Sequence, residues 1–163
     1  MNIRLATEED LPVINTIYNQ AVMQKFCTAH LAPVDMEYRR AWFNNHPPDR
    51  YPVYVSQEEK KVTGWVSLGA YRADRQALIH VGEVSYYVGR ESRGRGLGSH
   101  LLQHAINVAP ACGLSILVAI LLDKNPASIK LLKKFRFSQW GSMPGIAIIE
   151  KERANHLYYG LKL

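Results

Sequence analysis

The chain has 163 residues, which suits one globular domain with its own hydrophobic core. Its net charge of +6 suits an anionic ligand or nucleic acid, although a solvated basic surface gives the same balance. No apolar run approaches the roughly 20 residues that span a bilayer, and no apolar signal segment stands at the N-terminus. Cys27 and Cys112 are too few for a disulfide framework and lack the spacing of metal ligands. We therefore expect a cytoplasmic protein with one domain over residues 1–163, no membrane span and no metal site.

The first elements expected are a short strand and two helices. Residues 3–5 indicate the strand, and a helix is expected from Asp10 onward. The apolar positions of this helix recur at helical spacing: Leu11, Ile14, Ile17, Tyr18 and Ala21. A loop follows, and then a second helix is expected over residues 36–45. The residues predicted to face inward from it are Tyr38, Ala41 and Trp42.

The middle of the chain predicts two strands, a charged loop, and then a strand that leads into a helix. Residues 53–55 and 62–68 form the two strands, joined by a polar hairpin at residues 58–61. The charged loop spans residues 71–76. The helix after the next strand begins near Leu97 and is expected to close at Cys112 and Gly113, because glycine is the usual residue just past a helix end.

The last third predicts a buried strand, a capped helix and two closing strands. Residues 115–122 are almost wholly apolar, as in a strand covered on both faces. Asn125 can cap the following helix, with proline at its first position. The closing strands are expected at residues 137–140 and 156–161, around a turn at residues 143–145. The whole pattern predicts a single mixed α/β (α+β) domain.

The most informative stretch is residues 82–99, which run from a strand through a loop dense in glycine and arginine into a helix. A loop of small residues before a helix exposes backbone N–H groups, and the helix dipole adds positive potential there. Arg93 and Arg95 add full charges. These features predict an anion site, most simply for phosphate.

Two common phosphate-binding motifs do not fit this loop. A P-loop requires G-x-x-x-x-G-K-S/T, and no lysine follows the last glycine here. A dinucleotide fingerprint requires G-x-G-x-x-G/A early in a βαβ unit, whereas Gly94-x-Gly96-x-x-Ser99 is a near miss in the middle of the chain. Nor does an acidic residue end the next strand at the usual distance, Asp123 being the nearest.

A third pattern, Q/R-x-x-G-x-G/A, is met by residues 93–98. At this loop the chain resembles the GNAT acyltransferase superfamily. Residues 3–10, 83–88 and 125–129 resemble one branch of it, the phosphinothricin and methionine sulfoximine N-acetyltransferases. The resemblance spans nearly the whole chain.

The resemblance implies a fold, an activity and partners. The fold would be a strongly bent mixed sheet flanked by helices, in a homodimer. The activity would be transfer of an acetyl group from acetyl-CoA, as co-substrate, to the amine of a small amino-acid-like molecule such as phosphinothricin, methionine sulfoximine or methionine sulfone. The amine would attack the thioester directly in a ternary complex.

Glu83 is the expected catalytic residue. On a half-exposed strand its carboxylate could simply be solvated, but the resemblance places the catalytic glutamate at this position. Transfer to an amine requires that the ammonium lose a proton, and a partly buried carboxylate can accept it directly or through one water. Apolar neighbours would raise its pKa toward working pH.

The resemblance also assigns the groups that bind the cofactor. The main chain at Tyr87 and Val88 would hold pantetheine, and one N–H there would polarise the thioester carbonyl. Asn125 can cap a helix and also touch the cofactor arm. The whole expected set is Tyr86, Tyr87, Val88, Arg93, Gly94, Arg95, Gly96, Leu97, Gly98, Ser99, Asn125 and Ser128.

The acceptor site and one catalytic position are less defined. An amino-acid acceptor carries a carboxylate that arginine can pair with, so the expected substrate-binding residues are Phe26, Tyr71, Arg72 and Arg75. Each could equally be a core aromatic or a surface charge. Leu132 stands where the resembling branch has a histidine, and it cannot protonate a departing thiolate.

Three rival functions remain open at the level of sequence. The acceptor could be a polyamine, an aminoglycoside or a protein amine. The chain could also bind CoA without catalysis. A nucleic-acid-binding module would need basic residues interleaved with exposed aromatics along one element, whereas the basic residues here are scattered among acidic ones, so we expect no nucleic-acid partner.

Overall fold

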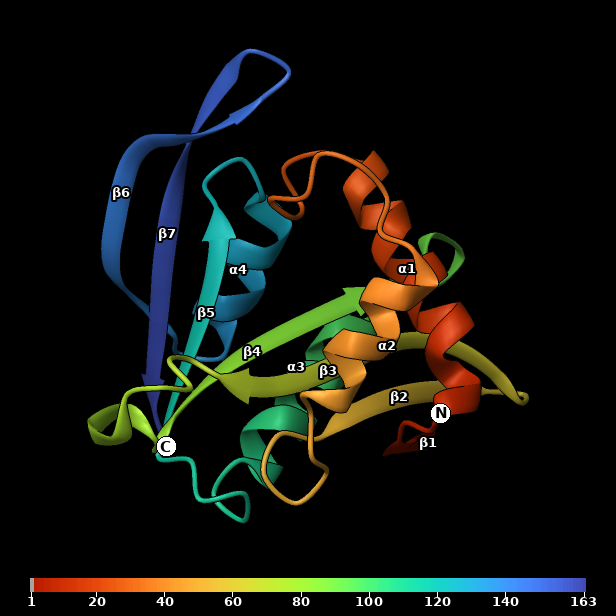
Figure 1. The fold of residues 1–163 in the computed structure, drawn as a ribbon. Helices are drawn as coiled ribbons and strands as arrows, with labels where there is room; N and C mark the ends of the chain where they lie inside the picture. The colour runs from red at the N-terminus through yellow and green to blue at the C-terminus, as the bar shows by residue number, and fades with distance from the viewer. Residues whose placement is uncertain (1) are drawn as a thin grey trace.

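A seven-stranded sheet forms the centre of the computed structural model, which describes residues 2–163 (Figure 1). Its strand order is β1-β2-β3-β4-β5-β7-β6; β4 and β5 are parallel, and the other neighbours are antiparallel. The strands are β1 (Asn2–Leu5), β2 (Val53–Glu58), β3 (Lys61–Ala70), β4 (Val81–Val88), β5 (Ile116–Leu122), β6 (Ser138–Ile149) and β7 (Glu152–Lys162). The helices are α1 (Leu11–Met23), α2 (Met36–Asn44), α3 (Leu97–Val108) and α4 (Pro126–Lys134). The mixed α/β domain that the sequence predicts is confirmed, as is the mixed sheet flanked by helices that the resemblance implies.

Strands β4 and β5 are paired only at their first residues. Val81 lies opposite Ile116, and Glu83, opposite Val118, is the last β4 residue with a β5 partner. Beyond this point the two strands diverge, as Figure 1 shows. Because β4 continues to pair with β3 on its other side, its free edge faces a gap in the middle of the sheet.

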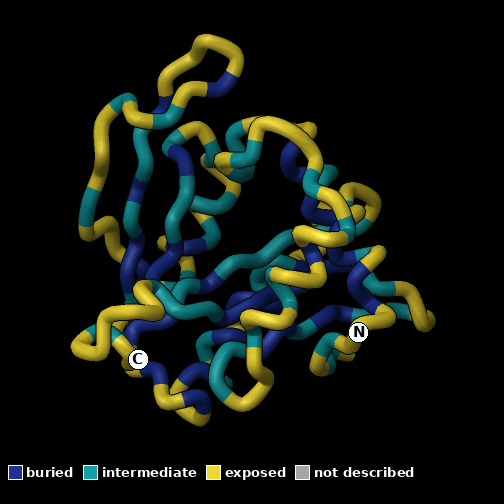
Figure 2. The backbone as a smooth tube through the Cα atoms, viewed as in Figure 1, coloured by how far each residue is buried: buried dark blue, intermediate teal, exposed yellow. Residues whose placement is uncertain are grey.

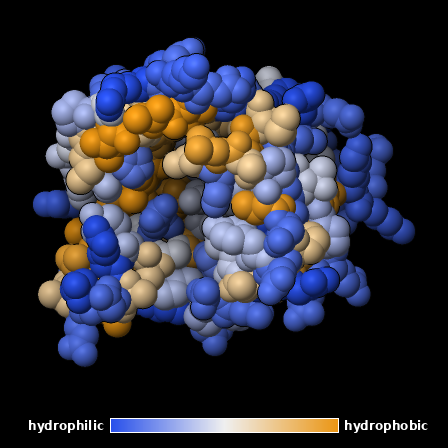
Figure 3. Space-filling view, turned by 45° about the horizontal axis from the view of Figure 1, so that its top comes forward, coloured by the Kyte–Doolittle hydropathy of each residue, from blue (hydrophilic) through white to orange (hydrophobic). Residues whose placement is uncertain are grey.

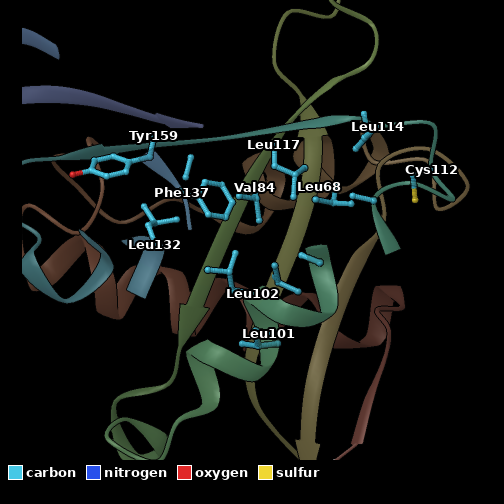
Figure 4. Packing of buried hydrophobic residues seen from close by; sticks show 14 of the residues in the cluster. Leu68, Val84, Leu101, Leu102, Cys112, Leu114, Leu117, Leu132, Phe137 and Tyr159 are labelled. Carbon is cyan, nitrogen blue, oxygen red and sulfur yellow. The ribbon is translucent and has the colours of Figure 1, made fainter. Parts of the chain in front are cut away.

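Helices cover both faces of the sheet. On one face, α1 and α2 pack over β2 and β3 around Tyr18 and Trp65. On the other face, α3 and α4 pack around Leu102 and Leu132 (Figure 4). Successive side chains of a strand point to opposite faces, so Trp65 joins the first core and Val66 the second.

Helix α2 turns a different face inward from the one the sequence predicts. Tyr38 and Ala41 are exposed, Trp42 is half-buried, and the buried residue between them is Arg39, with 2 % of its surface accessible. Its guanidinium carbon lies 4.6 Å from the ring centroids of both Tyr18 and Trp42. The aromatic surface above the sheet therefore accepts a cation where an apolar side chain was expected.

Two boundaries in the second half also differ from prediction. Helix α3 ends at Val108 instead of Cys112, because Pro110 has no N–H with which to continue the helical hydrogen bonds. The C-terminal hairpin turns at Glu150 and Lys151, both at positive φ, so the expected turn at residues 143–145 is instead an irregularity within β6. Most of β6 is exposed along the edge of the sheet (Figure 2).

Candidate active site

Two adjoining cavities open where β4 and β5 diverge. The Glu83 cavity, about 360 Å³, lies between β4, β5, α2 and the segment after α1. The glycine-loop cavity, about 260 Å³, lies between the same strands, α4 and the loop before α3. Both are lined by Cys27, Ser85, Tyr87, Ile120 and Leu121. Figure 3, in which the top of the Figure 1 view comes forward, shows a hollowed surface with hydrophobic residues beside the hollow.

Glu83 lies at the point where β4 loses its β5 partner. Its side chain shares the α1/α2 face of β4 with Ser85 and Tyr87, and all three line the Glu83 cavity. No ion pair or side-chain hydrogen bond is found for this carboxylate among residues 2–163. Burial raises its pKa above the ordinary value of 4.5. A carboxylate held in this way has a greater affinity for protons than an exposed one, as a proton acceptor at a catalytic site requires.

The glycine loop leaves its backbone N–H groups free. Gly94 and Gly96 have φ of +76° and +79°, and a Cβ on either would meet no atom within 4 Å. Across residues 2–163, no hydrogen bond is recorded from the N–H groups of residues 94–98. These groups lie at the positive end of the α3 dipole, so the loop fits a phosphate group. A cofactor with a diphosphate therefore matches the donor set of this chain.

The two arginines of the loop already have partners. Arg93 donates from Nε to the Val88 carbonyl at 3.1 Å and from Nη1 to Gln24, which ties the loop to β4 and α1. Arg95 forms an ion pair of 2.9 Å with Glu58 at the surface. Arg93 lines the glycine-loop cavity, whereas Arg95 does not.

Helix α4 closes the glycine-loop cavity. The Asn125 side chain accepts from the Ser128 N–H at 3.2 Å, which confirms the predicted cap, and both residues line the cavity. Leu132 presents only methyl groups there. Burial raises the pKa of the Tyr86 phenol to about 12, so that group stays protonated at neutral pH.

The structure brings together part of the expected cofactor set. The residues that line the glycine-loop cavity are Tyr86, Tyr87, Val88, Arg93, Gly98, Asn125 and Ser128. The others belong to the adjoining loop and the first turn of α3: Gly94, Arg95, Gly96, Leu97 and Ser99. A Cβ on Gly98 would lie 3.2 Å from the Leu131 side chain, so the close approach of α3 to α4 needs a small residue there.

The expected substrate-binding residues line neither cavity. Tyr71, Arg72 and Arg75 lie in the loop between β3 and β4, at the end of β4 that is still paired with β5. Arg75 pairs with its neighbour Asp74 at 2.8 Å. Phe26 packs against the small core near Leu122.

The Glu83 cavity is also lined by residues outside the expected site, and Arg39 among them was not foreseen from the sequence. Arg39 of α2 lines it, together with His30 of the loop after α1 and His156 of β7. The Tyr18 hydroxyl bonds to His30 Nδ1 and to Thr28 at 2.8 Å, which holds this wall of the cavity. Little in the sequence predicts that Arg39 is buried, because an arginine between aromatic positions on a polar helix is typical of a solvated charge.

Residues 2–163 contain neither a membrane-spanning helix nor a metal-binding cluster of side chains. None of their helices is long and apolar enough to span a bilayer. Nor do three or more of their histidine, cysteine, aspartate and glutamate side chains gather in a group that could hold a metal ion.

Comparison with known proteins agrees with this geometry. Residues 17–137 match the acetyltransferase (GNAT) family. YwnH of Bacillus subtilis, a candidate phosphinothricin acetyltransferase, is 38 % identical over 100 % of this chain and 96 % of its own. The L-methionine sulfoximine/L-methionine sulfone acetyltransferase of Salmonella typhimurium is 35 % identical over 91 % of this chain and 86 % of its own.

A solved structure supports the same assignment. The structure of yncA from Salmonella typhimurium, a candidate acetyltransferase with its cofactor acetyl-CoA, superposes with a TM-score of 0.94 and 33 % identity. It covers 100 % of this chain, which in turn covers 94 % of that one. The resemblance noted in the sequence is thus confirmed: the chain belongs to the GNAT family of acetyltransferases.

Proposed function

We propose that this enzyme transfers the acetyl group of acetyl-CoA to the α-amine of a small amino acid of the phosphinothricin, methionine sulfoximine or methionine sulfone type. The observation that carries the proposal is the place of Glu83. This half-buried carboxylate lines the Glu83 cavity at the point where β4 and β5 diverge, and the glycine-loop cavity adjoins it. The names of the relatives supply the acceptor class.

Glu83 acts as the proton acceptor in this proposal. An amino acid enters the Glu83 cavity as an ammonium ion, and the carboxylate takes one proton, which frees the nitrogen lone pair for attack. The free edge of β4 beyond Glu83 carries N–H groups that face the gap and can donate to the thioester carbonyl oxygen. The two reactants meet directly, without an acyl-enzyme.

The glycine loop and α4 bind the second reactant. Free N–H groups at residues 94–98 hold the diphosphate, and the opening between α4 and β4 receives the pantetheine arm. When bound, acetyl-CoA supplies the acetyl group as an activated thioester. Leu132 offers no proton, but a thiol pKa of about 8.5, as in cysteine, lets the sulfur leave as a thiolate.

The proposal is tested by release of free thiol from acetyl-CoA across a panel of amines. We expect turnover with L-phosphinothricin, L-methionine sulfoximine and L-methionine sulfone, and much less with spermidine, an aminoglycoside or a peptide amine. Preference for one of the latter amines would contradict the acceptor class. Tight CoA binding with no turnover on any amine would identify a non-catalytic protein.

We further propose a cytoplasmic homodimer. Exposed apolar side chains line the edge strand β6, where a second copy could cover them: Trp140, Met143, Ile146 and Ile148. Cys27 and Cys112 are both free, as expected in a reducing compartment. Light scattering after size-exclusion chromatography measures the oligomeric state; a monomeric mass would contradict the dimer.

A further inference from the structure

Arg39 is a buried cation in the wall of the Glu83 cavity. It lies on the inward face of α2, and 2 % of its surface is accessible. Moving a charged group away from water is unfavourable unless a partner compensates the charge. A buried arginine is therefore expected to have an anionic partner.

No such partner is found within residues 2–163. The guanidinium makes one recorded hydrogen bond, from Nε to Asn15 Oδ1 at 3.2 Å, and it has no ion pair. Its Nη2 is buried without an acceptor. Since Asn15 is neutral, the positive charge of Arg39 is not compensated by the residues around it.

Aromatic rings pack against the faces of the Arg39 guanidinium. Its carbon lies 4.6 Å from the ring centroids of Tyr18 and Trp42 and 5.8 Å from that of Trp65. Cation–π contacts of this kind offset part of the cost of burial. They occupy the faces of the planar group and leave the N–H groups of Nη1 and Nη2 without an acceptor among residues 2–163, and a carboxylate can bind such a pair in bidentate fashion.

Glu83 and Arg39 line the same cavity with opposite charges but do not pair with each other. Tyr87 lies near both: burial is the main cause that raises the pKa of its phenol, Glu83 raises it further, and Arg39 lowers it. The cavity therefore offers one anionic and one cationic group, and a zwitterion with neighbouring ammonium and carboxylate groups complements this pair.

We propose that Arg39 binds the carboxylate of the acceptor and thereby makes the enzyme specific for α-amino acids over simple amines. This inference rests on the proposed acetyltransferase function. The ammonium is directed to Glu83 while Arg39 holds the carboxylate, so Arg39 both binds the acceptor and orients its amine.

Two acceptors that differ only in the carboxylate test the inference. L-Methionine sulfone carries it, and 3-(methylsulfonyl)propan-1-amine lacks it. Loss of a hydrogen-bonded charge pair should lower kcat/KM for the amino acid by about 10- to 100-fold in Arg39→Met. The same variant should leave kcat/KM for the simple amine and the KM of acetyl-CoA within about three-fold of wild type.

Three further variants make the comparison specific. Arg39→Lys keeps the charge but not the planar pair of N–H donors, so it should lose part of the selectivity for the amino acid. This variant also tests the inference if Arg39→Met folds poorly. Arg40→Met removes the adjacent, exposed arginine and should change nothing. Arg72→Met tests the arginine expected from sequence. Equal losses on both acceptors in Arg39→Met and Arg39→Lys, or a selective loss in Arg72→Met alone, would overturn the inference.

A binding measurement separates this inference from the function on which it rests. Trp42 and Trp65 flank Arg39, so their fluorescence should respond when L-methionine sulfone enters the cavity. We expect a saturable change in wild type that is weakened at least ten-fold in Arg39→Met. Wild type that binds the amino acid but does not acetylate it would refute the proposed function alone. Equal affinity of wild type and Arg39→Met would refute the role of Arg39.

Discussion

The side chain of Glu83 has few neighbours that stabilise its charge. No ion pair or side-chain hydrogen bond is recorded for it within residues 2–163, and burial is the cause that raises its pKa. The carboxylate is therefore favoured to take up a proton, and the cavity in front of it is wide enough for a small amine.

Replacement of Glu83 by glutamine should remove the proton acceptor and keep the shape of the site. We expect kcat to fall by about 10²- to 10⁴-fold, the usual contribution of general base catalysis, while acetyl-CoA binds with unchanged affinity. Free-thiol kinetics and calorimetric titration of CoA measure the two quantities. An unchanged kcat would remove Glu83 from the mechanism.

Glu83 should also make stability depend on pH. Because its pKa is raised in the folded protein, the native state keeps a proton that the unfolded chain releases, so stability falls as pH rises from the ordinary value of 4.5 through the raised one. Glu83→Gln avoids this loss. Its Tm should therefore match that of wild type at about pH 4 and exceed it at neutral pH.

A matched control for the pH series is Glu91→Gln, which removes the same charge from an exposed carboxylate paired with Lys61. The gain in Tm of Glu83→Gln between about pH 4 and neutral pH should exceed the gain of this control. A difference for Glu83→Gln that shrinks as pH rises would contradict a raised pKa for Glu83 in the folded protein.

At the scale of elements, the loop between β4 and α3 combines unusual backbone geometry with free donors. Gly96 is the N-cap of α3 and has φ of +79°. Alanine there meets no steric obstacle from other residues, so its cost is conformational and should lower the free energy of unfolding by about 1 kcal/mol.

The same substitution should disturb the diphosphate site. We expect Gly96→Ala to raise the KM of acetyl-CoA more than that of the amine, because the loop N–H groups shift. Gly96→Asn is the control, since asparagine tolerates positive φ better than alanine does. Urea denaturation and steady-state kinetics measure both effects; equal behaviour of the two variants would contradict the conformational explanation.

Most elements could be predicted because their signals are local. Asn125 followed by proline marks the start of α4, and the Gly-Arg loop marks that of α3. The inward face of α2 could not be predicted in this way. Arg39 is buried because Tyr18 and Trp65, from two other elements, bring their rings to it. Helical periodicity contains no information about such partners.

For the whole molecule, the net charge of +6 should favour an anionic co-substrate over a zwitterionic one. Raising the ionic strength from about 0.05 M to about 0.5 M shortens the screening length to a few ångströms. The KM of acetyl-CoA should then rise several-fold while that of L-methionine sulfone changes much less. Steady-state kinetics at both ionic strengths tests this, and equal changes would show that long-range charge does not select between the two.

The sequence by itself determined the family, the class of fold, and the strand–loop–helix segment that places Glu83 before the glycine loop, because turn residues, caps and motif spacing act over a few neighbouring positions. Only the tertiary structure decided which distant residues share the cavity. The divergence of β4 and β5 opens the site at one end of β4, so Arg72 at the paired end is left outside, while Arg39 from another helix is brought in. Such proximity depends on how the elements pack, and no short stretch of sequence specifies it.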